Sequence, residues 1–401
     1  MVMKTAVIFA PTPSSFQPIA GVPLIQRTVL SALRCGFDRI MVVDTRYAEP
    51  LQALFAGDIR TQGVEVLDAL PALEGAVVAV IPGDCVLTTA TLQCVTAVCP
   101  KDRPILFTSV SQSAVALCAP AMLAGIGLGT LRDGSPETVW AMLQSQGAHS
   151  MPLDGEVCVR ISDGPSVVAA EKALGRQLRR GTAASDGPLA YWIDRRLSWR
   201  ISCWLVRHTS LRPNHITLIG TCVGLLAAAV LSRGTYWAGV AGTGLFLWAI
   251  IIDGCDGEVA RLTFRESAFG QAFDVITDNI VHAAIFAGLA VGVYRQQPAG
   301  HAVGLLTLLL GGFACTLAVS YFFLVRRPGF AQSGSKPVSF KGKVRQSLLR
   351  GFEGLMNRDF AYVLVLFALL GRLHWFVWGT AFGTYLFAGL LIWIYRWRDA
   401  A

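Results

Sequence analysis

Residues 248–294 read WAIIIDGCDGEVARLTFRESAFGQAFDVITDNIVHAAIFAGLAVGVY, and this stretch decides how the second half of the chain folds. Two apolar runs, each able to enter a bilayer, flank a piece that is rich in charge. The charged side chains include Asp253, Asp256, Asp274 and Asp278. Carboxylates at membrane depth cost free energy, and they are therefore typical of functional sites.

Apolar runs of this kind recur through the second half of the chain. Of the 401 residues, 53% are hydrophobic and only 15% are charged, a composition too apolar for an ordinary soluble protein. Six segments have the length and apolarity of bilayer-spanning helices. They cover roughly 214–232, 236–254, 275–294, 302–325, 360–371 with its flanks, and 374–395. We therefore expect an all-α, polytopic membrane domain with six transmembrane helices.

The distribution of basic residues predicts the orientation of these spans. The net charge of +8 arises in residues 186–401. Of the Lys and Arg residues that flank the predicted spans, only Arg233, Arg295 and Arg372 lie at one end, and all the others lie at the opposite end. The positive-inside rule then predicts a multi-pass protein of the inner (cytoplasmic) membrane. Both termini and the carboxylates are expected on the cytoplasmic side. The first residues read as a buried strand rather than as a secretory signal peptide.

The segment ahead of the first span alternates aromatic and aliphatic side chains with arginine. It reads GPLAYWIDRRLSWRISCWLVRHTSLRPNHIT, residues 187–217. This pattern predicts an amphipathic helix in the membrane interface, anchored by Trp192, Trp199 and Trp204. Pro213 is expected to end that helix and to begin the first span.

The four aspartates have the spacing of two helical faces. Asp253 and Asp256 are three positions apart, and Asp274 and Asp278 are four apart, so each pair shares one face of a helix. Two such helices side by side would gather four carboxylates, which need positive charge between them. Oxygen ligands without Cys or His favour two divalent cations, Mg²⁺ or Mn²⁺. The ten cysteines form no C-x-x-C pair, which argues against a zinc site or a disulfide framework.

Eight positions around these aspartates form a longer pattern. It runs Asp253-x-x-Asp256-Gly257-x-x-Ala260-Arg261, then eight residues, then Gly270-x-x-x-Asp274-x-x-x-Asp278. The pattern resembles the signature of the CDP-alcohol phosphotransferases (CDP-alcohol phosphatidyltransferases). The run RPNHIT, with Asn214 and Thr217, also resembles the family's segment at the entry to its first membrane helix.

The resemblance implies a fold and a reaction for residues 187–398. Such proteins have six membrane helices, are usually homodimers, and transfer a phospho-alcohol from a CDP-alcohol to an acceptor hydroxyl with release of CMP. The resemblance implies that the metal ions are ligated by Asp253, Asp256, Asp274 and Asp278. It also implies that Asp278 is the general base. We assign Gly257, Ala260, Arg261, Gly270, Asn214 and Thr217 to the CDP site.

Aspartates with arginine and glycine in a membrane domain also fit a second class of protein. Ion-coupled transporters use such groups as proton or sodium sites, and they place them near the bilayer midplane. The aspartates of this chain lie at one end of their predicted spans, which favours the transferase. We expect a lipid bilayer and a CDP-alcohol as partners, and no nucleic acid.

The sequence pattern of residues 1–180 predicts a separate cytoplasmic α/β domain. Short apolar strands such as TAVIFA and AVVAVIP alternate with helical stretches. The runs PIAGVPLIQRTVLSALRCGFDRIMVV and VIPGDCVLT resemble the nucleotidyltransferases of glycosyltransferase-A type, in which Asp84 would stand at a metal position. The loop APTPSSFQ lacks the Gly and the basic residue that cradle a triphosphate, and Gln17 replaces a usual Lys. We therefore expect an inactive domain that serves assembly, stability or regulation, and the alternative is an active enzyme that makes the CDP-alcohol. The segment RQLRRGTAASDGPLA is the expected linker.

The order of the two domains resembles the bifunctional inositol-phosphate cytidylyltransferase and di-inositol-phosphate phosphate synthases. That resemblance implies an acceptor that is an alcohol or a phosphorylated polyol. Basic residues on the predicted cytoplasmic side would bind its phosphate: Arg196, Arg326, Arg327 and Arg358. The donor is left open between CDP-diacylglycerol and CDP-inositol, and the pathway is phospholipid or phospho-inositol biosynthesis.

Overall fold

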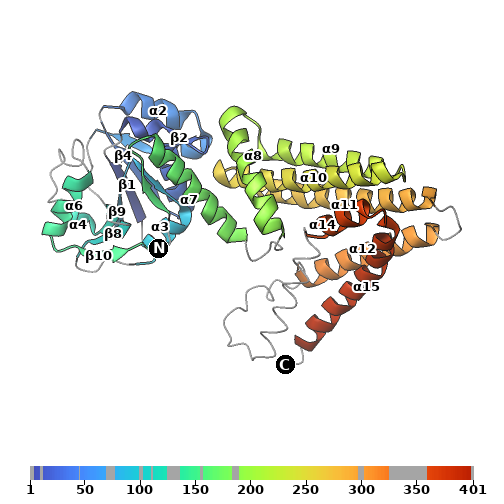
Figure 1. Cartoon of the computed structure of the whole chain (residues 1–401). Coiled ribbons are helices and arrows are strands. Elements are labelled where there is room, and N and C mark those ends of the chain that lie inside the picture. Colours follow the sequence, from blue (N-terminus) through green and yellow to red (C-terminus); the bar gives the residue numbers. More distant parts are fainter. Residues whose placement is uncertain are drawn as a thin grey trace. The chain divides into compact units, whose positions relative to one another are not determined.

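The computed structural model describes most of the chain and divides it into two compact units. The described residues are 4–9, 12–44, 46–68, 77–98, 103–109, 112–123, 136–153, 157–182, 189–296, 302–324 and 359–398. Unit 1 comprises residues 1–178 with Leu262–Phe264, and unit 2 comprises residues 179–261 and 265–401. Figure 1 shows a mixed α/β unit and an all-helical unit. The sequence predicted these two fold classes, α/β for the first half of the chain and all-α for the second.

A seven-stranded mixed sheet forms the centre of unit 1. Its strand order is β10-β8-β9-β6-β1-β4-β5. Strand β1 pairs in parallel with β4 and β6, whereas β9 is antiparallel to β6 and β8. The bounds are β1 Lys4–Phe9, β4 Arg39–Val43, β5 Glu65–Leu67, β6 Val77–Pro82, β8 Ile105–Ser109, β9 Gln112–Cys118 and β10 His149–Pro152. Two short antiparallel ladders complete it: β2 Pro18–Ile19 with β3 Val22–Pro23, and β7 Cys85–Leu87 with β11 Cys158–Arg160.

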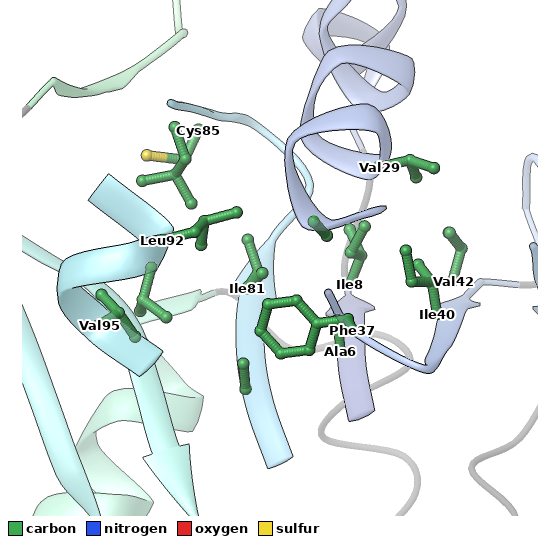
Figure 2. Packing of buried hydrophobic residues seen from close by; sticks show 14 of the residues in the cluster. Ala6, Ile8, Val29, Phe37, Ile40, Val42, Ile81, Cys85, Leu92 and Val95 are labelled. Carbon is green, nitrogen blue, oxygen red and sulfur yellow. The ribbon is translucent and has the colours of Figure 1, made fainter. Parts of the chain in front are cut away.

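Helices cover both faces of this sheet, because successive side chains of a strand point to opposite sides. In β1, Ala6 and Ile8 belong to one core with α1, whereas Val7 and Phe9 belong to another with Trp140 of α6. Figure 2 shows the first core, where side chains from β1, β4 and β6 meet α1 and α3. The helices are α1 Leu24–Arg34, α2 Ala48–Ala56, α3 Thr89–Thr96, α4 Pro120–Leu123, α6 Pro136–Ser145 and α7 Gly164–Thr182, with short 3-10 turns at Pro13–Phe16 and Ile59–Thr61.

Unit 2 contains only helices among its described residues. A π-helical turn, Ala190–Asp194, leads into α8 Arg195–His208. The following helices are α9 Pro213–Leu231, α10 Tyr236–Leu262, α11 Ala268–Gln296, α12 Ala302–Leu324, α14 Phe360–Leu369 and α15 Leu373–Arg398. Pro213 is the first residue of α9, as predicted.

Three of the six expected spans are confirmed as helices long and apolar enough to cross a membrane. They are α9, α10 and α11. Helices α12 and α15 lie where further spans are predicted, and α14 has 10 residues, too few to span alone. Six spans therefore remain a prediction.

Two helices extend beyond the approximate bounds predicted from the sequence. Helix α10 continues to Leu262 and α11 begins at Ala268, so all four aspartates are helical, as their spacing predicted, whereas Arg265 and Glu266 lie between the two helices. Helix α7 continues to Thr182, so the first part of the predicted linker is helix as well. Both segments carry good helix-forming residues such as Leu, Arg, Gln and Ala, and charge alone does not end a helix.

Glycines allow α9 and α11 to pack with their backbones in contact. A Cβ atom added at Gly288 would lie 2.4 Å from the carbonyl oxygen of Ala228, and one at Gly292 would lie 2.4 Å from that of Leu231. Both positions must therefore lack a side chain for the two helices to approach as they do. This contact fixes α11, which carries Asp274 and Asp278, against α9.

Candidate metal and nucleotide site

Three of the predicted metal ligands converge at one place. Carboxylate oxygens of Asp253 and Asp256 on α10 and of Asp274 on α11 lie within 4.8 Å of one another. Asp256 is buried, and the other two are half-buried. The helical spacing of the first pair and the packing of the two helices together explain the cluster.

Asp278 lies one helical turn beyond Asp274 on α11 and is not part of that group of three. Its backbone carbonyl is 2.7 Å from Nδ1 of His282. The side chain of Asp278 is half-buried. The roles predicted for Asp278, metal ligand and general base, therefore stay predictions.

Helix α9 supplies a polar contact to this cluster through Thr217. Its Oγ1 donates a hydrogen bond to Oδ2 of Asp256, and both residues are buried. A charge-assisted bond of this kind holds one carboxylate oxygen in place. The sequence assigned Thr217 to the CDP site, and the structure shows in addition that it holds one carboxylate of the aspartate cluster.

Arg261 lies back over Gly257, one turn earlier on the same helix. A Cβ atom at Gly257 would be 3.3 Å from Nη1 of Arg261 and 3.4 Å from Nη2. The glycine therefore leaves room for the guanidinium beside the aspartates. The Nε atom of Arg261 is buried and makes no hydrogen bond within the described residues. Ala260, on the same face, is buried.

Asn214 and Gly270 meet where α9 and α11 begin. A Cβ atom at Gly270 would lie 3.3 Å from Oδ1 of Asn214 and 3.1 Å from Oγ of Ser267. Oγ of Ser267 accepts a hydrogen bond from the amide of Gly270 at 3.0 Å. The two residues predicted for the CDP site are thus neighbours in space, although 56 positions separate them in the chain.

The converging side chains fit divalent cations. All three contribute carboxylate oxygens, with no sulfur or imidazole in the group, which is the donor set of Mg²⁺ and Mn²⁺. Three carboxylates this close repel one another unless a cation lies between them.

A buried carboxylate next to the signature was not predicted from the sequence. Glu258 is 3% exposed, and its two oxygens accept hydrogen bonds of 2.8 Å from Ser198 and Ser202 of α8. Arg195 lies 3.8 Å away. The one signal in the sequence is the spacing of the two serines, four positions apart on an otherwise Trp- and Arg-rich helix.

The remaining residues predicted to bind phosphate or to anchor α8 have mixed outcomes. Trp192 and Trp204 are exposed, and Trp199 is half-buried. Arg196 is exposed and stacks over the ring of Trp192, 5.0 Å from its centroid. Arg326, Arg327 and Arg358 lie outside the described residues.

In unit 1, Asp84, which was predicted at a metal position, forms an ion pair with an arginine of the same unit. Oδ2 of Asp84 accepts a hydrogen bond from Nε of Arg160 at 2.9 Å, and Arg160 also binds Glu137. Burial raises the pKa of Asp84, an effect that Arg160 opposes. Asp84 therefore has its counter-charge already.

Three backbone amides in the described part of the loop after β1 donate hydrogen bonds within the loop. The amide of Thr12 donates to Oγ of Ser15, that of Ser15 to the carbonyl of Thr12, and that of Gln17 to the carbonyl of Ser14. Amides used in this way are not directed at a ligand. The described part of this loop thus agrees with the lack of Gly and basic residues in its sequence.

A comparison with known families adds to this geometry. Residues 210–385 match the model of the family described as CDP-alcohol phosphatidyltransferase, and the match spans the whole cluster of aspartates. Over residues 210–385, less than half of the chain, the sequence is thus similar to this family. The matched segment contains every residue of the predicted metal and CDP site.

Curated relatives agree with this assignment over part of their length. The chain is 32% identical over 139 residues to a "Bifunctional IPC transferase and DIPP synthase" of Archaeoglobus fulgidus, covering 35% of this chain and 27% of that protein. It is 34% identical over 112 residues to an "Archaetidylinositol phosphate synthase" of Methanothermobacter thermautotrophicus, covering 28% and 51%. The matched segments span about half or less of these relatives.

Solved structures were compared as well. One is the phosphatidylinositol phosphate synthase of Mycobacterium tuberculosis with CDP-DAG bound, at 21% identity, 49% of this chain, 94% of that chain and a TM-score of 0.32. Another is the inositol-1-phosphate CTP transferase from T. maritima, at 12% identity, 42% of this chain, 96% of that chain and a TM-score of 0.33. Scores of this size carry no conclusion about either unit.

Proposed function

We propose that the chain is a metal-dependent CDP-alcohol phosphotransferase of the cytoplasmic membrane. It transfers a phospho-alcohol from a CDP-alcohol to the hydroxyl of a second alcohol and releases CMP. The observation that carries the proposal is the convergence of Asp253, Asp256 and Asp274 beside Arg261 in a segment that is similar to the CDP-alcohol phosphatidyltransferase family.

The residues of the chain divide the work of this reaction. Asp253, Asp256 and Asp274 hold the cations, which when bound neutralise charge on the diphosphate of the donor. Arg261 supplies a fixed positive charge beside them. Asn214, Gly257, Ala260 and Gly270 shape the place of the CDP moiety.

Asp278 accepts the proton of the attacking hydroxyl. Its position one turn from Asp274 on α11 places it next to the metal site, where an acceptor hydroxyl would come within reach of a carboxylate. The proton leaves the acceptor oxygen as that oxygen bonds to phosphorus, and the bond from phosphorus to the CMP oxygen breaks.

The donor is a CDP-alcohol of the CDP-diacylglycerol or CDP-inositol type, and the acceptor is an alcohol or a phosphorylated polyol. The names of the curated relatives support an inositol phosphate as acceptor. The basic residues on one side of the spans support a cytoplasmic site and cytoplasmic termini. A homodimer is the expected assembly.

Unit 1 has no cytidylyltransferase activity in this proposal. The pairing of Asp84 with Arg160 and the self-bonded loop after β1 support that view. Unit 1 then serves the stability or assembly of the membrane domain.

The proposed activity is tested by measuring CMP. Purified full-length protein is incubated with CDP-diacylglycerol or CDP-inositol, Mg²⁺ or Mn²⁺, and a panel of alcohols that includes inositol phosphate. We expect CMP only when donor, acceptor and cation are all present. If no donor yields CMP while the protein binds Mn²⁺, the proposed reaction is wrong.

A further inference from the structure

Helix α10 presents two neighbouring faces near its cytoplasmic end. One face carries Asp253 and Asp256, which meet Asp274 of α11 and Thr217 of α9. On the second face, Cys255 and Val259 form an apolar cluster with Ile216 of α9, and side chains of α8 pack against it. Glu258, next to Val259 in the chain, adds a buried acidic group on the side of α8.

Glu258 joins α10 to α8 through both of its oxygens. Oε1 accepts a hydrogen bond from Ser198 and Oε2 one from Ser202, each at 2.8 Å. Both serines are buried, with exposures of 1% and 0%. Two hydroxyls one helical turn apart thus fix the carboxylate and, with it, the register of α8 along α10.

Two arginines share this carboxylate as their counter-charge. Arg195 of α8 is 7% exposed and lies 3.8 Å from Oε1 of Glu258. Arg261 follows Glu258 by three positions on α10, so the two side chains are neighbours on the surface of that helix. Two buried guanidinium groups repel each other, and an acidic group between them lowers the cost of keeping both.

Arg261 stands at the border between the two faces of α10. Its guanidinium lies over Gly257, on the side of the aspartates, and its Nε has no hydrogen-bond partner within the described residues. Glu258, three positions earlier and bonded to α8, places its carboxylate beside Arg261 on the side of that helix.

We propose that Glu258, held by Ser198 and Ser202, is a positioning residue that keeps Arg261 directed toward the diphosphate of the donor. This inference rests on the proposed function for its ligand, a nucleoside diphosphate. It assigns α8 a role beyond lying in the membrane interface, since α8 holds the group that balances the arginine of the site.

Two variants separate the charge of Glu258 from the hydrogen bonds that hold it. Glu258→Gln keeps the size of the side chain, and its amide still bonds both hydroxyls, but the counter-charge is lost. The double variant Ser198→Ala/Ser202→Ala keeps the charge and removes both bonds. Ser232→Ala is the matched control, because that hydroxyl donates to Ala229 within its own helix.

Three measurements on the full-length protein in detergent provide the readouts. They are the affinity for CDP in the presence of Mn²⁺, the affinity for Mn²⁺ by electron paramagnetic resonance, and hydrogen exchange of the amides of α8. None of them requires turnover.

We expect Glu258→Gln to weaken CDP binding at least tenfold while Mn²⁺ affinity and α8 exchange change less than twofold. The double serine variant should raise exchange in α8 at least tenfold and weaken CDP binding, again with Mn²⁺ affinity retained. Ser232→Ala should match the wild type.

The inference is overturned if Glu258→Gln binds CDP as the wild type does, since Glu258 is then only an anchor for α8. Loss of Mn²⁺ binding in that variant also contradicts it, because the hydrogen bonds of Glu258 go to the serines of α8 and not to the metal ligands. If Glu258→Gln fails to fold, the double serine variant decides: unchanged CDP affinity despite faster exchange contradicts the proposal. Failure of the wild type to bind CDP with Mn²⁺ would instead refute the proposed function, and the exchange data would still test the link between α8 and α10.

Discussion

Replacing Gly288 by Ala should force α9 and α11 apart. The new Cβ atom would lie 2.4 Å from the carbonyl oxygen of Ala228, a contact far shorter than any that real side chains make, and the obstacle is backbone that cannot rotate away. Overpacking of this kind costs about 1–3 kcal/mol. Ala also favours a helix over Gly by about 1 kcal/mol. Taking the upper end of the packing cost, we expect a net loss of about 2 kcal/mol.

Gly244 of α10 provides the matched control. A Cβ atom there would meet nothing within 4 Å, so Gly244→Ala should be neutral or stabilising by up to about 1 kcal/mol. Equilibrium unfolding in detergent, followed by tryptophan fluorescence, measures both variants. The two should differ by about 3 kcal/mol, combining the two values above. Equal stability of Gly288→Ala and Gly244→Ala would refute the close approach of α9 and α11.

Three further outcomes follow from individual contacts. Thr217→Val leaves Asp256 without its hydrogen bond and should lower Mn²⁺ affinity about tenfold, whereas Thr217→Ser should retain it; a Mn²⁺ titration that does not distinguish the two variants contradicts this role. Arg160→Ala removes the cation that opposes the raised pKa of Asp84, so the unfolding free energy of unit 1 should fall as pH rises from about 4 and recover on acidification, and a pH-independent loss would be the contrary result. Residues 1–182 expressed alone should fold but show no saturable micromolar binding of CTP with Mg²⁺ by calorimetry, and binding near −8 kcal/mol would make the chain bifunctional.

The sequence was sufficient for features that depend on local periodicity. Helical spacing predicted that Asp253 and Asp256 share a face, and they do converge with Asp274. Apolar length predicted α9, α10 and α11 as spans. These features depend on residues within one or two helical turns of each other or within one continuous apolar run.

The sequence could not predict contacts made across the fold. Thr217 and Asp256 are 39 positions apart, and Ser198 and Glu258 are 60 apart, so their meeting depends on how three helices pack. The ends of α10 and α11 were predicted only roughly, because an apolar run marks the part of a helix inside the bilayer and not where the helix ends. Packing against neighbouring helices extends both helices beyond their apolar runs.

The central claim is that Asp278 is the base of a CDP-alcohol transfer at this metal site. Its most direct test is the single-turnover rate of CMP release by Asp278→Asn, measured beside its affinity for CDP with Mn²⁺. A general base contributes about 10²–10⁴-fold to the rate, and it acts in the transition state rather than in binding. The account predicts a rate lower by at least about 10²-fold with CDP affinity nearly unchanged. A variant that keeps half of the wild-type rate would contradict it.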